Sequence, residues 1–423
     1  METTLRPQDI ADVLARLAEA NRQVGVAYPG ERPDRQPVHT VYGGAQLFTA
    51  DVVRKLGGAA ERLMREYAPD PSTLAAAVGL GGDPTFQRTV YERVAGKLTH
   101  EPIEDFRIDF EDGYGHRLDR EEDGHAVQCA EETVRAMKDG TLPPWIGIRV
   151  KPFSDELQAR GIRTLDLYLT RLVQAGGGML PPHFVVTLPK IRNPEQVAAL
   201  AAALEWLEVR LKLAAGSIPI ELMIETPQSI FGSDGRVVLA DLVRAGGGRV
   251  RGAHFGTYDY TANCGITAHY QQHQHPACDF ARHVMQVSLA DTGVTLSDGA
   301  TTVLPVPPHR EAAGDVPLSA DQRSANRSAV HRAWKIHYQD VRSSLRHAYY
   351  QGWDLHPGQL VTRYAAVYAF FLESRAGAAE RLKTFVAKSA QATLLGATFD
   401  DAATGQGLLN FFLRGINCGA ITE

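Results

Sequence analysis

Cysteine is scarce in this sequence. Its 423 residues contain four, none with the C-x-x-C spacing: Cys129, Cys264, Cys278 and Cys418. This argues against a zinc cluster and a disulfide framework and is typical of a reducing compartment. Long apolar runs are also missing, because none approaches the ~20 residues of a membrane span, and the N-terminus has no apolar region of the signal-peptide kind. We therefore expect a cytoplasmic protein without a membrane partner.

The sequence also lacks a dense block of Lys or Arg, and its formal net charge is −5. A nucleic-acid partner is therefore not expected. Internal repeats and low-complexity segments are absent as well. A chain of this length buries a sizeable core, and its size alone allows either one barrel with extensions or two domains.

Short apolar runs that are typical of strands occur eight times, and most are followed by a helical pattern, as at Asn193–Leu213 and Pro357–Leu372. Strand and helix in alternation predict a parallel sheet closed on itself, the (β/α)8 or TIM barrel of the α/β class. The predicted strands are His39–Tyr42, Asp105–Phe110, Trp145–Val150, His183–Leu188, Ile218–Ile224, Val250–Phe255, Val294–Leu304 and Trp353–Leu355.

The predicted barrel has additions at both ends and one insertion. An amphipathic helix is expected at Asp9–Val24, followed by a Pro-rich linker. Ser319 and Gln322 match a capping box that begins a long helix, and Gly352 is expected to end it as a C-cap. We divide the chain into an N-terminal arm, a barrel with an inserted helix, and a C-terminal helical extension: residues 1–36, 37–375 (insertion at about 319–350) and 376–423.

Two carboxylates, Glu225 and Asp259, each stand where an apolar run gives way to a polar turn. In a parallel β/α protein, an acid that follows a strand points into the mouth of the barrel. Because these acids follow successive strands, we expect them to share a divalent metal. Mg²⁺ (or Mn²⁺) suits the pair, since Mg²⁺ keeps several waters and often takes only one or two protein carboxylates.

Motifs at six of the predicted strand ends resemble, in order, those of the citrate lyase β-subunit / HpcH-HpaI aldolase superfamily. Its barrel is related to those of malate synthase and malyl-CoA lyase. The resemblance spans roughly residues 38–373. Its six motifs are Asp109-Phe-Glu-Asp112, Ile148-Arg149-Val150, Leu188-Pro189-Lys190, Ile224-Glu225-Thr226, Phe255-Gly-Thr-Tyr-Asp259-Tyr260 and Leu355-His356-Pro357-Gly-Gln359.

The resemblance implies roles for these positions, and Arg149 is central among them. An arginine inside an apolar strand is rarely buried without a carboxylate or phosphate partner. In the family the matching arginine contacts the substrate and steadies an enolate. An ion pair with Asp109 or Glu111 is the alternative. The expected site residues are Arg149, Glu111 and Asp112 for catalysis, Arg149, Gly256 and Thr257 for substrate binding, and Glu225 and Asp259 for the metal.

Other polar residues are expected to be structural. Lys190 could form a Schiff base, but its motif resembles a superfamily that uses metal-stabilised enolates, which favours an electrostatic or structural role. Glu221 lies about 13 Å before Glu225 along its strand, near the barrel floor. His254 is a general-base candidate only if it points into the barrel. The tract His269–His275 is expected to be solvated surface.

The resemblance implies a Mg²⁺-dependent carbon–carbon lyase, or aldolase, acting on a small-molecule 2-oxo acid. A CoA-thioester lyase, synthase or hydrolase and a catalytically silent binding barrel are the alternatives. We favour a free acid, because the turn Tyr42-Gly-Gly-Ala-Gln46 lacks the proline and the arginine that CoA-using relatives tend to carry there. A homo-oligomer is expected.

Overall fold

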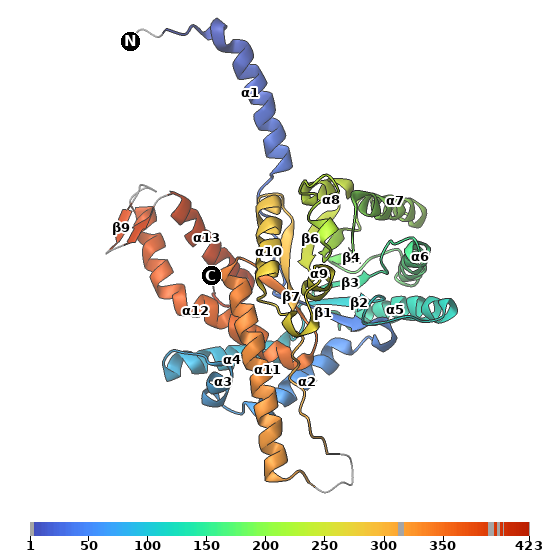
Figure 1. The fold of residues 1–423 in the computed structure, drawn as a ribbon, viewed down its shortest axis with the longest axis vertical. Helices are drawn as coiled ribbons and strands as arrows, with labels where there is room; N and C mark the ends of the chain where they lie inside the picture. Colours follow the sequence, from blue (N-terminus) through green and yellow to red (C-terminus); the bar gives the residue numbers. More distant parts are fainter. Residues whose placement is uncertain (1–3, 312–316, 388–392, 396–397, 401, 423) are drawn as a thin grey trace.

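A closed barrel of parallel strands forms the centre of the molecule (Figure 1). The computed structural model describes residues 4–311, 317–387, 393–395, 398–400 and 402–422. The strands pair in sequence order, and the last pairs with the first, as the alternating pattern predicted. They are β1 (His39–Gly44), β2 (Asp105–Asp109), β3 (Trp145–Arg149), β4 (Phe184–Leu188), β5 (Ile220–Ile224), β6 (Val250–Phe255), β7 (Thr295–Ala300) and β8 (Gln351–Asp354).

Helices connect the strands and cover the outside of the barrel. Several begin at a side-chain cap: Asp70, Asp83 and Asn193 each accept a bond from a backbone N–H three residues on and precede a proline. The covering helices are α2 (Val52–Tyr67), α3 (Pro71–Val78), α4 (Pro84–His100), α5 (Asp119–Asp139), α6 (Gln158–Ala175), α7 (Pro194–Leu211), α8 (Leu239–Ala245), α9 (Thr257–Asn263), α10 (Pro276–Leu289), α11 (Ala320–Arg346) and α12 (Pro357–Ala387).

The inserted helix α11 begins as predicted but ends early. Ser319 Oγ accepts a bond from the backbone of Gln322 (3.2 Å), and Gln322 Oε1 accepts one from the backbone of Ser319 (2.9 Å), which confirms the capping box. Gly352 is not a C-cap, and that prediction was wrong, because the residue lies inside β8. A Cβ there would lie 2.6 Å from Arg363 Nη1. Gly352 therefore lets an arginine side chain pass close to the strand.

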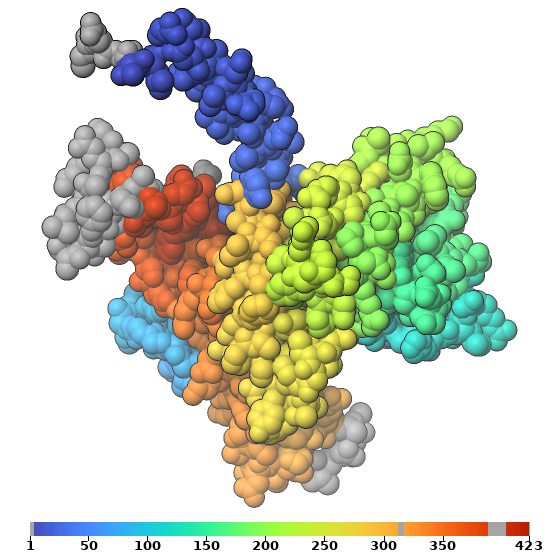
Figure 2. Space-filling model, turned by 45° about the horizontal axis from the view of Figure 1, so that its top comes forward, coloured from blue at the N-terminus to red at the C-terminus, as the bar shows by residue number. Residues whose placement is uncertain are grey.

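Two segments extend beyond the barrel. The N-terminal helix α1 (Pro7–Ala27) has no buried residue and stands away from the body in both views (Figures 1 and 2). At the other end, α12 continues past residue 376, the predicted start of the extension, and α13 (Ala402–Asn417) packs against it. Between them lie two short antiparallel strands that the sequence did not predict, β9 (Thr393–Leu395) and β10 (Thr398–Asp400). None of the described helices has the length and apolar character that crossing a membrane requires.

Buried charges fill the lower interior of the barrel. Arg107 bonds to Asp105 Oδ1 (2.5 Å) and to Glu221 Oε2 (2.6 Å). His254 points into the barrel, where its Nε2 lies 3.0 Å from the same Glu221 oxygen. Glu221 is thus part of a buried ion-pair network, as expected of a structural residue, and His254 belongs to the same network. Such an interior stays stable only when every buried charge keeps its partner.

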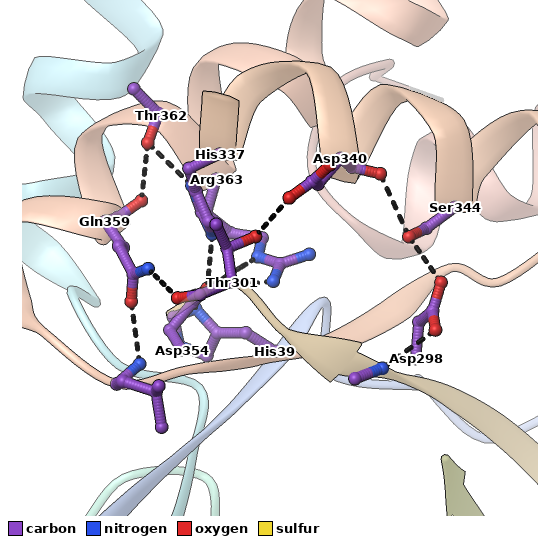
Figure 3. Close-up of polar contacts among 12 residues, drawn as sticks. His39, Asp298, Thr301, His337, Asp340, Ser344, Asp354, Gln359, Thr362 and Arg363 are labelled. Atoms are coloured by element: carbon purple, nitrogen blue, oxygen red, sulfur yellow. Dashed lines mark hydrogen bonds and ion pairs between the residues drawn. The ribbon is translucent and has the colours of Figure 1, made fainter. Parts of the chain in front are cut away.

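A second polar network joins α11 and α12 to the last two strands (Figure 3). Asp354, at the end of β8, accepts bonds from Arg363 (2.8 Å) and lies within 3.1 Å of ring nitrogens of His39 and His337. Asp298 of β7 accepts a bond from Ser344 of α11 (2.6 Å). These contacts fix both helices on the outer face of the barrel at the end where the active site is predicted.

Candidate active site

The two predicted metal carboxylates meet at the carboxyl end of the barrel. Glu225 directly follows β5 and is 1% exposed, while Asp259 lies in the first turn of α9, after the neighbouring strand β6. Both acids contact Lys190. Its backbone N–H donates to Glu225 Oε1 (2.7 Å), and its Nζ lies 3.4 Å from Asp259 Oδ2.

Lys190 holds four acids together at this position. Its ammonium also contacts Glu111 and donates to Asp112 (3.0 Å). Its backbone has a left-handed φ of 50°, a conformation that a non-glycine residue adopts only when its surroundings stabilise it. Burial alone would lower the pKa of the ammonium, but the carboxylates of Glu225 and Glu111 raise it above its usual value. A Schiff-base lysine needs a lowered pKa, so the geometry supports the electrostatic role.

The positive charge near Glu225 is too small to keep the pKa of this buried carboxyl group at its usual value. Burial raises its pKa to about 8, and the charge of Asp259 acts in the same direction while Lys190 opposes it. Gly256 makes room for the side chain, since a Cβ there would lie 2.4 Å from Glu225 Cβ and 2.5 Å from its Oε2. The contact seen for Gly256, a predicted substrate-binding residue, is therefore with the predicted metal ligand.

Arg149 is buried beside this cluster in a fixed orientation. Its Nε and Nη2 donate to the two oxygens of Asp109 (2.7 and 2.6 Å), so the alternative of an ion pair with Asp109 is what the structure contains. The guanidinium lies against the rings of Tyr42 (4.7 Å) and Trp353 (5.2 Å), which also contact each other. Nη1 has no hydrogen-bond partner among the described residues, and the nearest carboxylate oxygen of Glu111 is 3.4 Å away. The guanidinium thus has one nitrogen, Nη1, that donates no hydrogen bond to the described residues.

The turn after β2 places the acids of the D-F-E-D motif. Asp109 accepts bonds from the backbone of Glu111 (3.0 Å) and of Gly113 (2.7 Å), which fixes the turn. Glu111 lies between Lys190 and the free donor of the arginine, and burial raises its pKa to about 7. The side chain of Asp112 is 57% exposed and faces the mouth. Both acids are close enough to hold the cations of the site.

Three residues of the site were not predicted as functional, although sequence patterns could have indicated them. Tyr42 and Trp353 point inward because strand residues alternate between the two faces, and Asp109 belongs to a recognised motif. Thr257, which was predicted, has a buried hydroxyl without a hydrogen-bond partner among the described residues. A Cβ on Gly299 of β7 would lie 2.2 Å from that oxygen, so Thr257 packs tightly against the next strand.

The carboxylate pair suits a divalent cation that takes few protein ligands. Within the described parts of the chain, no three His, Cys, Asp or Glu side chains are arranged to hold a metal ion. Two acids, Glu225 and Asp259, both contact Lys190, Glu225 through the backbone N–H and Asp259 through Nζ. Nothing among the described residues donates to Glu225 Oε2, which leaves it available as a ligand. This donor set matches Mg²⁺, which completes its octahedron with waters and substrate oxygens.

The histidine tract was only partly predicted correctly. His269 is exposed, but His273 is buried, and its Nε2 lies 3.2 Å from Asp298 Oδ2. The expectation of a solvated surface tract was therefore wrong for His273, because Asp298 and the α11 residue Ser344 supply polar partners beneath the loop. His356 accepts a bond from the backbone of Gly358 (3.1 Å), which is the structural role expected for it.

Comparison with known families identifies the chain. Residues 17–423 match the profile of the domain of unknown function DUF6986. The chain belongs to this family. No curated protein matches its sequence.

Solved structures share the barrel of this DUF6986 protein. A citrate lyase from Burkholderia xenovorans LB400 has a TM-score of 0.58 at 18% identity, over 93% of this chain and 95% of that one. A magnesium/glyoxylate complex of Haloferax volcanii malate synthase has 0.47 at 15% (79% and 76%). CitE from Mycobacterium tuberculosis, with magnesium, acetoacetate and coenzyme A, has 0.48 at 14% (92% and 100%). The predicted resemblance to a citrate lyase barrel is confirmed at the level of fold by the Burkholderia structure.

Proposed function

We propose that this DUF6986 protein is a Mg²⁺-dependent carbon–carbon lyase acting on a small 2-oxo acid. One observation carries the proposal: two carboxylates that follow neighbouring strands, Glu225 and Asp259, both contact Lys190, next to an arginine whose Nη1 has no hydrogen-bond partner among the described residues. When bound there, Mg²⁺ supplies a Lewis acid that stabilises negative charge on substrate oxygens as the adjacent bond breaks.

The protein residues then bind and orient the substrate. Arg149 Nη1 receives the substrate carboxylate, since the other two guanidinium nitrogens, Nε and Nη2, already bond Asp109. Glu111 and Asp112 hold the cations and order water at the mouth. Because Asp109 fixes the guanidinium before substrate arrives, little conformational entropy is lost when the carboxylate binds.

A free acid is the proposed substrate in preference to a CoA thioester. The turn after β1, with Gly44, Ala45 and Gln46, presents no cationic side chain to a diphosphate. Two linker arginines could have compensated, but Arg32 and Arg35 line a cavity with Asp105 and Trp145 at the amino ends of the strands. They are therefore at the opposite end of the barrel from the mouth.

The experiment is a side-by-side assay in Mg²⁺. Oxaloacetate and 4-hydroxy-2-oxo acids are compared with malyl-, citramalyl- and acetyl-CoA, with EDTA as the metal-free control. We expect Mg²⁺-dependent cleavage of a free acid. Turnover confined to the thioesters would favour the CoA alternative, and the absence of any Mg²⁺-dependent affinity for oxalate, pyruvate or oxaloacetate would favour a silent barrel. The expected homo-oligomer stays a prediction.

Arg149 offers a direct test of the substrate anchor. Arg149→Lys keeps the positive charge but lacks the guanidinium group, which bonds Asp109 with two nitrogens and offers the third to a substrate. We therefore expect that Arg149→Lys does not rescue the activity lost in Arg149→Ala. The loss in kcat/KM should correspond to about 1.5–3 kcal/mol, typical of a charged hydrogen bond. Steady-state kinetics with the assigned substrate measures it, and an unchanged kcat/KM in Arg149→Ala would show a purely structural residue.

A further inference from the structure

A second cavity of about 280 Å³ lies at the amino end of the barrel, opposite the proposed active site. The linker before β1 closes one side of it, and the starts of β2, β3 and β6 form the others. The linker is anchored there, because Gly30 N–H donates to Asp291 O (2.8 Å) and Glu31 pairs with Arg414 of α13 (2.8 Å). The cavity is therefore part of the folded structure.

Most of the charges around the cavity are already paired. Arg35 binds Glu101 (2.9 Å) and Glu104 (2.7 Å), and Lys97 contacts the same two acids, so these four residues form a neutral set. The inner end holds Arg107 with its two carboxylates. The ring of Trp145 forms one wall and stacks on Arg35 (5.1 Å).

Arg32 and Arg251 are the exceptions. Both guanidinium groups line the cavity and are half-buried, and the described residues offer neither a hydrogen bond nor an ion pair to them. Burial and the neighbouring charge of Arg32 lower the pKa of Arg251, and only Asp34 acts in the opposite direction. On this side of the cavity, two guanidinium groups therefore face a single carboxylate, that of Asp34. Like charges held together in this way are destabilising unless an anion joins them.

We propose that this cavity is a separate binding site for a small oxyanion, the phosphate or carboxylate group of a metabolite, held by Arg32 and Arg251. Guanidinium forks match the geometry of both groups. An anion between the two guanidinium groups relieves their mutual repulsion, and the carboxylates of Asp105 and Glu221 at the inner end limit how deep it can enter. The remainder of the ligand lies against the Trp145 ring. The site does not depend on the reaction proposed above.

Isothermal titration of the full chain in EDTA tests the site, with inorganic phosphate in one arm and succinate in the other. We expect saturable binding of at least one anion, with an affinity at least tenfold lower in Arg32→Gln/Arg251→Gln. In a separate fluorescence titration, binding should change the tryptophan emission of the wild type, and Trp145→Phe should remove that change. Binding by phosphate alone or by succinate alone identifies the group. Arg332→Gln, an exposed arginine on α11 outside the cavity, is the matched control and should bind as the wild type does.

Two results would overturn the site. One is the absence of saturable binding in both arms, and the other is an unchanged affinity in the double variant. Arg149→Ala should retain the affinity. A loss of affinity in this variant would show instead that the anion binds at the carboxyl end of the barrel. Circular dichroism shows whether the double variant is folded. If it is not, the single variants Arg32→Gln and Arg251→Gln are measured instead, and each should lose part of the affinity.

Discussion

Glu225→Gln abolishes Mg²⁺-dependent binding of oxalate while the protein remains folded. This is the expected result because glutamine has the shape of glutamate, fits against Gly256, and keeps an oxygen for the N–H of Lys190. Only the negative charge is lost, and a hard cation depends on that charge. Asp259→Asn should have the same effect. Calorimetric titration with Mg²⁺ or Mn²⁺ and oxalate measures the binding, and thermal melting measures the fold.

The matched control is Glu205→Gln, an exposed glutamate on α7. It should bind metal and oxalate as the wild type does. Gly256→Ala is the complementary variant, since its Cβ displaces Glu225 without removing a charge. It should weaken the metal-dependent binding as well. Mg²⁺ affinity like that of the wild type in either Glu225→Gln or Asp259→Asn would contradict the assignment of the metal site.

The second large effect is on stability and concerns Asp354. Burial raises the pKa of this carboxyl, but Arg363, with His337 and His39, holds it well below its usual range. Asp354→Asn leaves the Arg363 guanidinium buried without a counter-charge, and breaking a buried pair in this way costs about 3–5 kcal/mol. Urea denaturation followed by circular dichroism measures the loss. Asp234→Asn, a largely exposed site, is the control.

A loss below about 1 kcal/mol in Asp354→Asn would place the network of Figure 3 among interactions of the surface kind. Activity offers a second reading. The network lies behind β8, whose inward residue Trp353 stacks on Arg149. A folded variant with lower activity at saturating substrate would therefore show that the network also orients the arginine.

The barrel and the positions of the two carboxylates were predictable because they depend on local order along the chain. Glu225 and Asp259 each follow an apolar run, and parallel strands bring their carboxyl ends to one edge. The partners of Arg149 were harder to predict, because Tyr42 and Trp353 come from strands about 310 residues apart that meet only when the barrel closes. A periodic pattern gives the face of a strand but not its neighbour across the barrel.

Two errors have a similar physical origin. Gly352 follows a long helix, so its sequence context predicted a C-cap, while the close approach of Arg363 is what the structure shows there. His273 lies in a polar tract, and its burial depends on Asp298 and Ser344, which are distant in sequence. In each case the deciding contact was a tertiary one that no local window contains.

The missing side chain at Gly256 has a consequence for how this family can change over time. A buried glutamate at the end of β5 needs an empty space at the end of β6, so a change at one position is expected to require a change at the other. A family member that gains alanine at position 256 is expected to carry a smaller side chain than glutamate at position 225. In the same way, a member that keeps glutamate at position 225 is expected to keep glycine at position 256. Co-variation between these two columns should therefore trace which descendants of the family still carry the carboxylate pair.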